Sequence, residues 1–266
     1  MAQHSTLDDS TFDTNTFYRR TLHVLSDAQV PFLVGGSHAF LHYTGIARDT
    51  KDLDLFVRYE DLRPALEALA QGGYRTERTF AHWLAKAFQG DDFVDLVWSS
   101  GNGVARIDDG WFEHSIESQV LGMPVRLAPV EELIWQKAFL MERERFDGGD
   151  VMHLLLRCGK SLDWDRLVQR FGDNWRLLFS YLTLFSFVYP GVRGPIPDAV
   201  YQAFLDRARE GEPAAEPLLC RGTLVSRTQY LVDIGRWAFR DARIQPHGSM
   251  TPEETVYWTW AIDHVK

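Results

Sequence analysis

The sequence predicts an α/β fold in which a domain of strands and helices is followed by a helical domain. Residues 32–34 form an apolar run of the length of a buried strand, and a glycine turn and a helical pattern come after it. Residues 52–57 and 91–98 combine apolar residues with isolated aspartates, as strands of a partly buried sheet do. From Pro129 to Lys266 the apolar residues recur mainly with helical spacing.

Gly35-Gly36-Ser37 is the first candidate site. The order strand, glycine turn, helix aims backbone N–H groups at the start of the helix, where a bound anion is favoured. Taken alone, the two glycines indicate only a tight turn, and Ser37 could simply cap the helix. Because an acidic strand follows, we interpret the turn as a phosphate-binding element.

Asp52 and Asp54 form the second candidate site. Alternate residues of a strand face the same side, so these two carboxylates would lie next to each other while Leu53 and Leu55 face the core. A solvated edge strand is the alternative, but the apolar face argues against it. A divalent cation would remove the repulsion between the carboxylates. Asp95 is an isolated charge in the later strand, and it would join them if the two strands are neighbours.

Composition limits the classes of function. The chain has 266 residues, a formal net charge of −9 and a pI near 5.5. This acidic balance argues against nonspecific binding to the phosphate backbone of nucleic acids. Two cysteines, Cys158 and Cys220, fit a reducing cytoplasm rather than a disulfide framework. The polar N-terminus is not a secretory signal, and no apolar run approaches the ~20 residues of a membrane span. We therefore expect a cytoplasmic protein with no membrane contact.

The glycine turn, the Asp52-x-Asp54 pair and Asp95 together resemble the signature of the DNA-polymerase-β-like nucleotidyltransferase superfamily. Residues 31–58 are similar to its bacterial branch, which holds the lincosamide nucleotidyltransferases and the abortive-infection type toxin nucleotidyltransferases. The resemblance implies a mixed-sheet nucleotidyltransferase domain over residues 1–128. Within it, the polar residues 1–12 are expected to be disordered because of their composition and terminal position. The resemblance also implies a helical domain over residues 129–266 that completes the active-site cleft.

The resemblance also implies the ligands. Mg²⁺, or Mn²⁺ in its place, would be held by the three catalytic acids, and an NTP, most simply ATP, would be the donor. The metal ligands would be Asp52, Asp54 and Asp95. The nucleotide-binding residues would include Gly35, Gly36, Ser37, Lys137, Asp147 and Asp150. Arg48 and Thr50 are added because they lie between the helix and the acidic strand. There Arg48 could contact a phosphate or pair with a carboxylate, and a surface arginine is the alternative.

Lys137, Asp147 and Asp150 resemble the K…R…DxxD element of the toxin-like branch. The resemblance makes Lys137 the phosphate-binding lysine and gives the acids a supporting role. Gly148-Gly149 separates the two acids, which is unusual inside a helix and indicates a break. Which aspartate faces the site stays open, and a charged surface loop is the alternative.

These features predict a metal-dependent transfer of an NMP group from an NTP to an acceptor hydroxyl. The acidic net charge favours a small-molecule acceptor. Two alternatives remain: a toxin-like enzyme that acts on tRNA or protein, and a nucleotide-binding regulatory module with little turnover. The intact acids and glycine turn argue against the module.

Several local expectations follow. We expect helices over residues 14–28 and 60–71 and a hairpin over residues 119–127 with its turn at Gly122-Met123. His38 and His42 lie four apart on a helix, but no third ligand accompanies them, so we expect surface or hydrogen-bonded histidines.

Overall fold

The structure is a computed structural model that describes residues 8–48, 52–210, 216–262 and 264. The chain divides into two compact units. The first contains the described residues up to Ala39, the described residues between 47 and 99, and residues 106–129. The second contains residues 40–46 and 100–105 and the described residues from Val130 onward. The predicted fold class, a mixed-sheet α/β part and a helical part, is confirmed.

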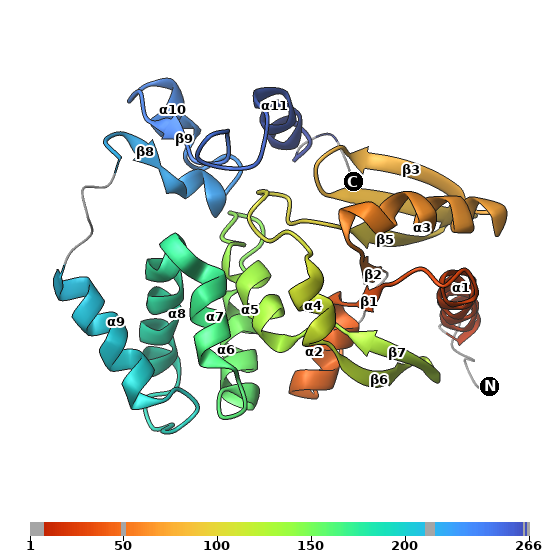
Figure 1. The fold of residues 1–266 in the computed structure, drawn as a ribbon, viewed down its shortest axis with the longest axis horizontal. Helices are drawn as coiled ribbons and strands as arrows, with labels where there is room; N and C mark the ends of the chain where they lie inside the picture. Colours follow the sequence, from red (N-terminus) through yellow and green to blue (C-terminus); the bar gives the residue numbers. More distant parts are fainter. Residues whose placement is uncertain (1–7, 49–51, 211–215, 263, 265–266) are drawn as a thin grey trace, which may run out of the picture. The chain divides into compact units, whose positions relative to one another are not determined.

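A seven-stranded mixed sheet is the framework of the first unit (Figure 1). Its strand order is β3-β4-β5-β2-β1-β7-β6. The pairs β5–β2 and β1–β7 are parallel and the other four pairs are antiparallel. The strands are β1 (Leu33–Val34), β2 (Leu53–Phe56), β3 (Arg75–Phe80), β4 (Leu84–Gln89), β5 (Asp92–Val97), β6 (Ile116–Val120) and β7 (Met123–Leu127). The chain thus places the two acidic strands, β2 and β5, side by side in the middle of the sheet.

Helices α1 (Asp8–Asp27) and α3 (Tyr59–Gln71) pack against each other and against this sheet. The apolar residues of α3 recur at helical spacing, and Leu62, Ala65 and Leu69 are buried, as the pattern predicts. Helix α1 begins earlier than expected: residues 8–12, which we expected to be disordered, are helical. Residues 1–7 lie outside the described residues.

The predicted hairpin is confirmed as β6 and β7, although its turn lies one residue earlier than the expected Gly122-Met123. Leu121 and Gly122 form its turn, both with positive φ (+53° and +76°), as a two-residue hairpin turn requires. The short helix α4 (Asp109–Glu113) precedes it. Arg58 joins α4 to the start of α3, because its guanidinium bonds to both Asp109 and Asp61.

Four packed helices make up the core of the second unit: α5 (Val130–Ala138), α6 (Gly148–Cys158), α7 (Trp164–Phe171) and α8 (Trp175–Val188). Helix α9 (Asp198–Glu210) packs on α8 (Figure 1). The fully buried Trp175 stacks on Phe204 of α9 with ring centroids 5.8 Å apart. Tyr181 donates to the carbonyl oxygen of Ala138 at 3.0 Å, which satisfies its buried hydroxyl.

The C-terminal part of this unit is less helical than the sequence predicts. It contains a two-stranded parallel sheet, β8 (Leu219–Cys220) with β9 (Arg240–Asp241), and the helices α10 (Leu231–Gly235) and α11 (Pro252–Trp260). These strands have only two residues each, which is too short to show a periodic pattern. No helix within the described ranges is long and apolar enough to cross a membrane.

Candidate functional site

The glycine turn joins β1 to α2 (Gly36–Thr44) and lies beside β2. The backbone N–H of Gly35 donates to the carbonyl oxygen of Asp54 at 2.9 Å. Gly36 has φ of +52°, a left-handed conformation that other residues adopt only at a cost. A Cβ atom on Gly36 would also overlap the Asp54 carboxylate. The carboxylate therefore lies directly against the Cα of Gly36, at the N-terminus of a nine-residue helix.

Two polar atoms of the first turn of α2 are buried without a hydrogen-bond partner among the described residues: Oγ of Ser37 and Nε2 of His38. Burial lowers the pKa of His38, so its ring is neutral at pH 7. His42 is exposed, as expected for a surface histidine, whereas His38 is half-buried. A buried polar atom without a hydrogen-bond partner costs free energy. A bound ligand that bonded to these two atoms would remove that cost, so they are candidate ligand contacts.

Charged residues from three neighbouring strands form a row across the sheet. The parallel register of β2 and β5 pairs Asp54 with Asp95. The antiparallel register of β4 and β5 pairs Asp95 with Lys86, whose Nζ donates to Oδ1 of Asp95 at 2.8 Å. Paired residues of neighbouring strands point to the same face of a sheet. We call Lys86, Asp95 and Asp54 the charged row; Asp52 lies one residue before β2.

Asp95, in the middle of the charged row, is partly enclosed. Burial raises the pKa of Asp95, and the negative charge of Asp52 adds to the effect. The ammonium of Lys86 acts in the opposite direction through its charge and its hydrogen bond. The influence of Asp52 on Asp95 places these two carboxylates in the same electrostatic neighbourhood.

Tyr18 of α1 lies close to the same carboxylates. Its side chain is buried, and the pKa of its hydroxyl is raised first by that burial and then by four negative charges. Those charges belong to Asp52, Asp92, Asp54 and Asp95. Thr14, one turn earlier on α1, donates to Oδ1 of Asp92 at 2.9 Å. Asp92 and Asp95 are three residues apart on β5, so their side chains face opposite sides of the sheet. Helix α1 therefore packs on the side opposite the charged row, within electrostatic range of its carboxylates, which the sequence did not reveal.

The acids fit a divalent cation that is shared with a substrate. Mg²⁺ keeps several waters and is usually bound by one or two carboxylates together with substrate phosphates, rather than by a cage of protein ligands. Asp52 and Asp54 supply such carboxylates, and Asp95 is adjacent but already bonded to Lys86. Within the described ranges no three His, Cys, Asp or Glu side chains form a ready cage. The donor set agrees with Mg²⁺ held partly by phosphate oxygens.

Two further predicted nucleotide-binding residues follow α2. Arg48 is exposed. Thr50 lies outside the described residues, as do its neighbours 49 and 51. Their contact with a nucleotide stays a prediction.

Lys137, in the last turn of α5, is bonded to both predicted aspartates of the second unit. Its Nζ donates to Oδ2 of Asp147 at 3.0 Å and to Oδ2 of Asp150 at 2.7 Å. Asp147 also accepts two bonds from the guanidinium of Arg145. Both aspartates are buried, so the alternative of a charged surface loop is wrong for them. Helix α6 begins at Gly148, so the glycines mark a helix start rather than a break within a helix.

These contacts lower the pKa of Asp147. Burial alone would raise it, but the bonds and charges of Arg145 and Lys137 outweigh burial and lower it. Lys137 belongs to the second unit and the charged row to the first. A contact of Lys137 with the triphosphate therefore stays a prediction.

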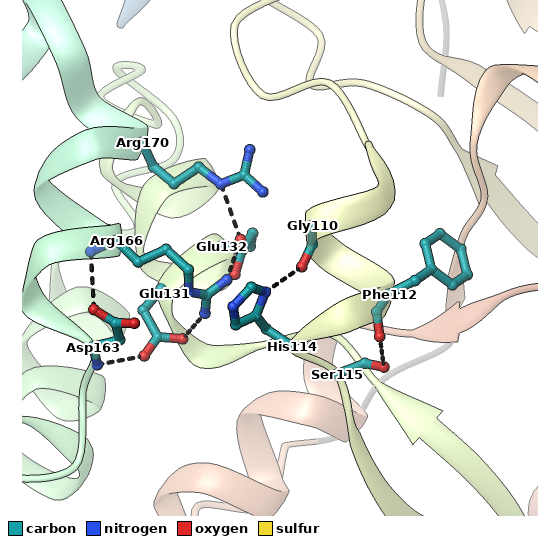
Figure 2. Close-up of polar contacts among 9 residues, drawn as sticks. All are labelled: Gly110, Phe112, His114, Ser115, Glu131, Glu132, Asp163, Arg166 and Arg170. Carbon is teal, nitrogen blue, oxygen red and sulfur yellow. Dashed lines mark hydrogen bonds and ion pairs between the residues drawn. The ribbon is translucent and has the colours of Figure 1, made fainter.

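A second buried ion network joins α5 to α7 (Figure 2). Arg166 bonds to both Glu131 and Glu132, and Arg170 donates to Glu132 at 3.0 Å. Glu131 also accepts from the backbone N–H of Asp163. Burial raises the pKa of Glu132, and the two arginines oppose this. The two glutamates of α5 thus pair with arginines of α7 and fix the packing of the two helices.

Lys86 is the site residue that the sequence analysis missed. It lies in Leu84–Gln89 as an isolated charge among apolar residues, the same signal that singled out Asp95. Applied to lysine as well as to aspartate, that criterion would have found both members of the pair.

Among known proteins the chain has distant likenesses to solved structures. No protein-family model and no curated protein matches the chain. Solved structures that it resembles include the antibiotic-resistance factor ANT(2'')-Ia in complex with adenylyl-2''-tobramycin (TM-score 0.45, 17% identity, 65% of this chain and 99% of that one). Another is the lincosamide antibiotic adenylyltransferase LnuA with lincomycin bound (0.37, 14%, 53% and 94%). A third is an antigenic nucleotidyltransferase-like protein from Paracoccidioides brasiliensis (0.36, 13%, 64% and 92%).

These likenesses are distant. With TM-scores below 0.5 and identities below 20%, what those proteins act on says nothing about what this chain acts on. The functional argument rests on the residues of the chain itself.

Proposed function

We propose that the chain is a metal-dependent nucleotidyltransferase that moves an NMP group from an NTP, most simply ATP, to a hydroxyl of a small molecule. One observation carries the proposal: the Asp54 carboxylate lies against Gly36 at the start of α2 and in register with Asp95. This arrangement brings carboxylates for a cation next to a helix N-terminus for phosphate.

In this proposal, some residues of the first unit hold the metal ion and others bind the phosphates. Asp52 and Asp54, with Asp95 beside them, would hold Mg²⁺, which supplies positive charge to phosphate oxygens when bound. The N–H groups at the start of α2 favour an anionic phosphate, and the buried Ser37 hydroxyl, which lacks a partner within the described ranges, is available to bond to it.

Asp95 is the group best suited to accept the acceptor's proton. Burial raises its pKa, which makes it a stronger base than an exposed aspartate, while Lys86 helps to keep it ionised. In the transfer, the acceptor oxygen forms a bond to the α-phosphorus as the bond from that phosphorus to pyrophosphate breaks. The hydroxyl proton passes to the carboxylate.

The rest of the proposal concerns the second unit and the acceptor. Residues 129–266 would complete the cleft, with Lys137 bonding to the triphosphate and Asp147 and Asp150 orienting its ammonium. The net charge of −9 supports a small acceptor over tRNA, because a tRNA would bring many phosphates to an acidic protein.

A transfer assay with labelled nucleotide tests the proposal. The purified chain is incubated with Mg²⁺ and each of the four NTPs labelled at the α-phosphate. Separate reactions contain hydroxyl-bearing antibiotics and metabolites, tRNA, or protein substrates. We expect label on a small molecule and release of pyrophosphate. Label on tRNA or protein alone would reject the small-molecule acceptor, and nucleotide binding without any transfer would reject the enzyme.

A further inference from the structure

Lys86 is the positively charged member of the charged row. Its side chain and that of Asp95 are each only 16% exposed. The ammonium lies 3.9 Å from the centroid of the Phe93 ring, which covers it on another side. An ammonium enclosed in this way is costly without a counter-charge, and Asp95 provides that counter-charge at 2.8 Å.

Asp95 is also where a metal ion would meet Lys86. The carboxylate stands in register between the ammonium on β4 and Asp54 on β2, so one cation already occupies one of its oxygens. A divalent ion drawn to Asp52 and Asp54 would approach the same carboxylate and would be repelled by the ammonium.

We propose that Lys86 is a built-in counter-cation of the charged row: it stabilises the metal-free site by pairing with Asp95, and it competes with a divalent cation for that carboxylate. The inference rests on the proposed function, because it assumes that the acids bind metal. It assigns Lys86 a positioning role, since its ammonium acts on the metal only through Asp95.

Two consequences follow from the competition. Without metal, the loss of the ammonium leaves Asp95 close to the other acids and unpaired, so the free protein becomes less stable. With metal, the same loss removes a repelling charge, so the cation binds more tightly. A residue that only supported the fold would produce the first effect without the second.

The test uses the full chain and Mn²⁺ as the probe, without nucleotide. Lys86→Met keeps most of the side-chain length and removes the charge, and Lys86→Arg keeps the charge. Lys160→Met is the matched control, because Lys160 is exposed and the substitution is the same. Thermal unfolding of the metal-free protein and Mn²⁺ affinity by calorimetry are measured for each.

We expect Lys86→Met to lower the metal-free Tm by several degrees and to bind Mn²⁺ about tenfold more tightly than the wild type, with Lys86→Arg and Lys160→Met near wild type. Unchanged or weaker Mn²⁺ binding in Lys86→Met, with normal binding in the wild type, would overturn the inference and leave the proposed function standing. Absence of Mn²⁺ binding from both proteins would overturn the inference alone, because phosphate oxygens of the nucleotide complete the metal site in the proposed function, which the transfer assay tests separately.

If Lys86→Met fails to fold without metal, the double variant Lys86→Met/Asp95→Asn tests whether the lost ion pair is the cause. It contains no buried unpaired charge, so it should regain most of the lost stability. A double variant that is no more stable than Lys86→Met would show that the ion pair is not what Lys86 contributes, and the inference would fail.

Discussion

Gly36 is the residue whose replacement would most directly disturb the turn between β1 and α2. Its left-handed φ and the Asp54 carboxylate against its Cα are independent reasons for glycine. Gly90 provides a comparison, because it has φ of +63° and no atom within 4 Å of a Cβ built on it. Backbone strain and steric overlap can therefore be separated experimentally.

We predict that Gly36→Ala destabilises the protein more than Gly90→Ala does. Backbone strain alone should cost about 1–2 kcal/mol at either position, and only Gly36→Ala adds an overlap with Asp54. The measurement is the free energy of unfolding by chemical denaturation, together with nucleotide affinity by calorimetry. Equal losses of stability and unchanged affinity in Gly36→Ala would show that the turn is only structural.

At the residue scale, the sequence identified site residues where a charged residue interrupts an otherwise apolar strand and no structural role explains it. Aspartates inside apolar strands could be recognised in that way, and Asp54 and Asp95 are in register, as one shared site requires. Tyr18 and Ser37 could not be assessed, because a buried tyrosine or a helix-start serine is ordinary in sequence. Their surroundings become unusual only through tertiary packing.

At the scale of elements, Lys137 connects α5 to the start of α6. Its ammonium bonds to two aspartates whose side chains are less than 10% exposed. The removal of one partner from a buried ion group costs about 3–5 kcal/mol, because the remaining charges are left unpaired.

We predict that Lys137→Ala lowers the free energy of unfolding by about 3 kcal/mol and weakens triphosphate binding by about 100-fold. Lys160→Ala is the control, because it removes an exposed lysine from the same unit. Both are measured at a temperature at which all variants are folded. A variant with lower stability but wild-type nucleotide affinity and kinetics would limit Lys137 to joining the two helices.

The lowered pKa of Asp147 gives a prediction about acid stability. A carboxylate with a lowered pKa in the folded state contributes stability that is complete above its ordinary pKa of about 3.9. That contribution is lost as pH falls through the lowered value. We therefore expect Asp147→Asn to be less stable than wild type at pH 7, and we expect the difference to shrink below about pH 4. A difference that is independent of pH would show that charge is not the cause.

The sequence predicted elements well where they are long and periodic. Helix α3 and the β6–β7 hairpin occur where they were expected, because each has a repeating apolar face and a clear turn. Strands β8 and β9 were not predicted, since two residues carry no period. The network of Arg166 and Arg170 with the glutamates of α5 could not be predicted either, because pairing between helices depends on tertiary packing.

At the scale of the whole molecule, the excess of acidic residues sets the expected partners. With a net charge of −9, the chain should have low affinity for nucleic acid outside a specific site. We predict that labelled tRNA at 150 mM salt binds more weakly than a Kd of about 10⁻⁴ M, the weak end of ordinary nonspecific binding. Fluorescence anisotropy measures this, and micromolar binding that weakens steeply with salt would favour the tRNA acceptor.

The central claim is that Asp52 and Asp54 hold a metal-bound nucleotide. The measurement that tests it most directly is calorimetric titration with Mg²⁺ and a non-hydrolysable ATP analogue. It compares the wild type, the double variant Asp52→Asn/Asp54→Asn, and Asp91→Asn, a control that removes an exposed aspartate from the same unit. We expect the double variant to lose at least about 100-fold in affinity while it stays folded without metal, because neutral amides relieve the repulsion between carboxylates. Wild-type affinity and full transfer activity in the double variant would contradict the account.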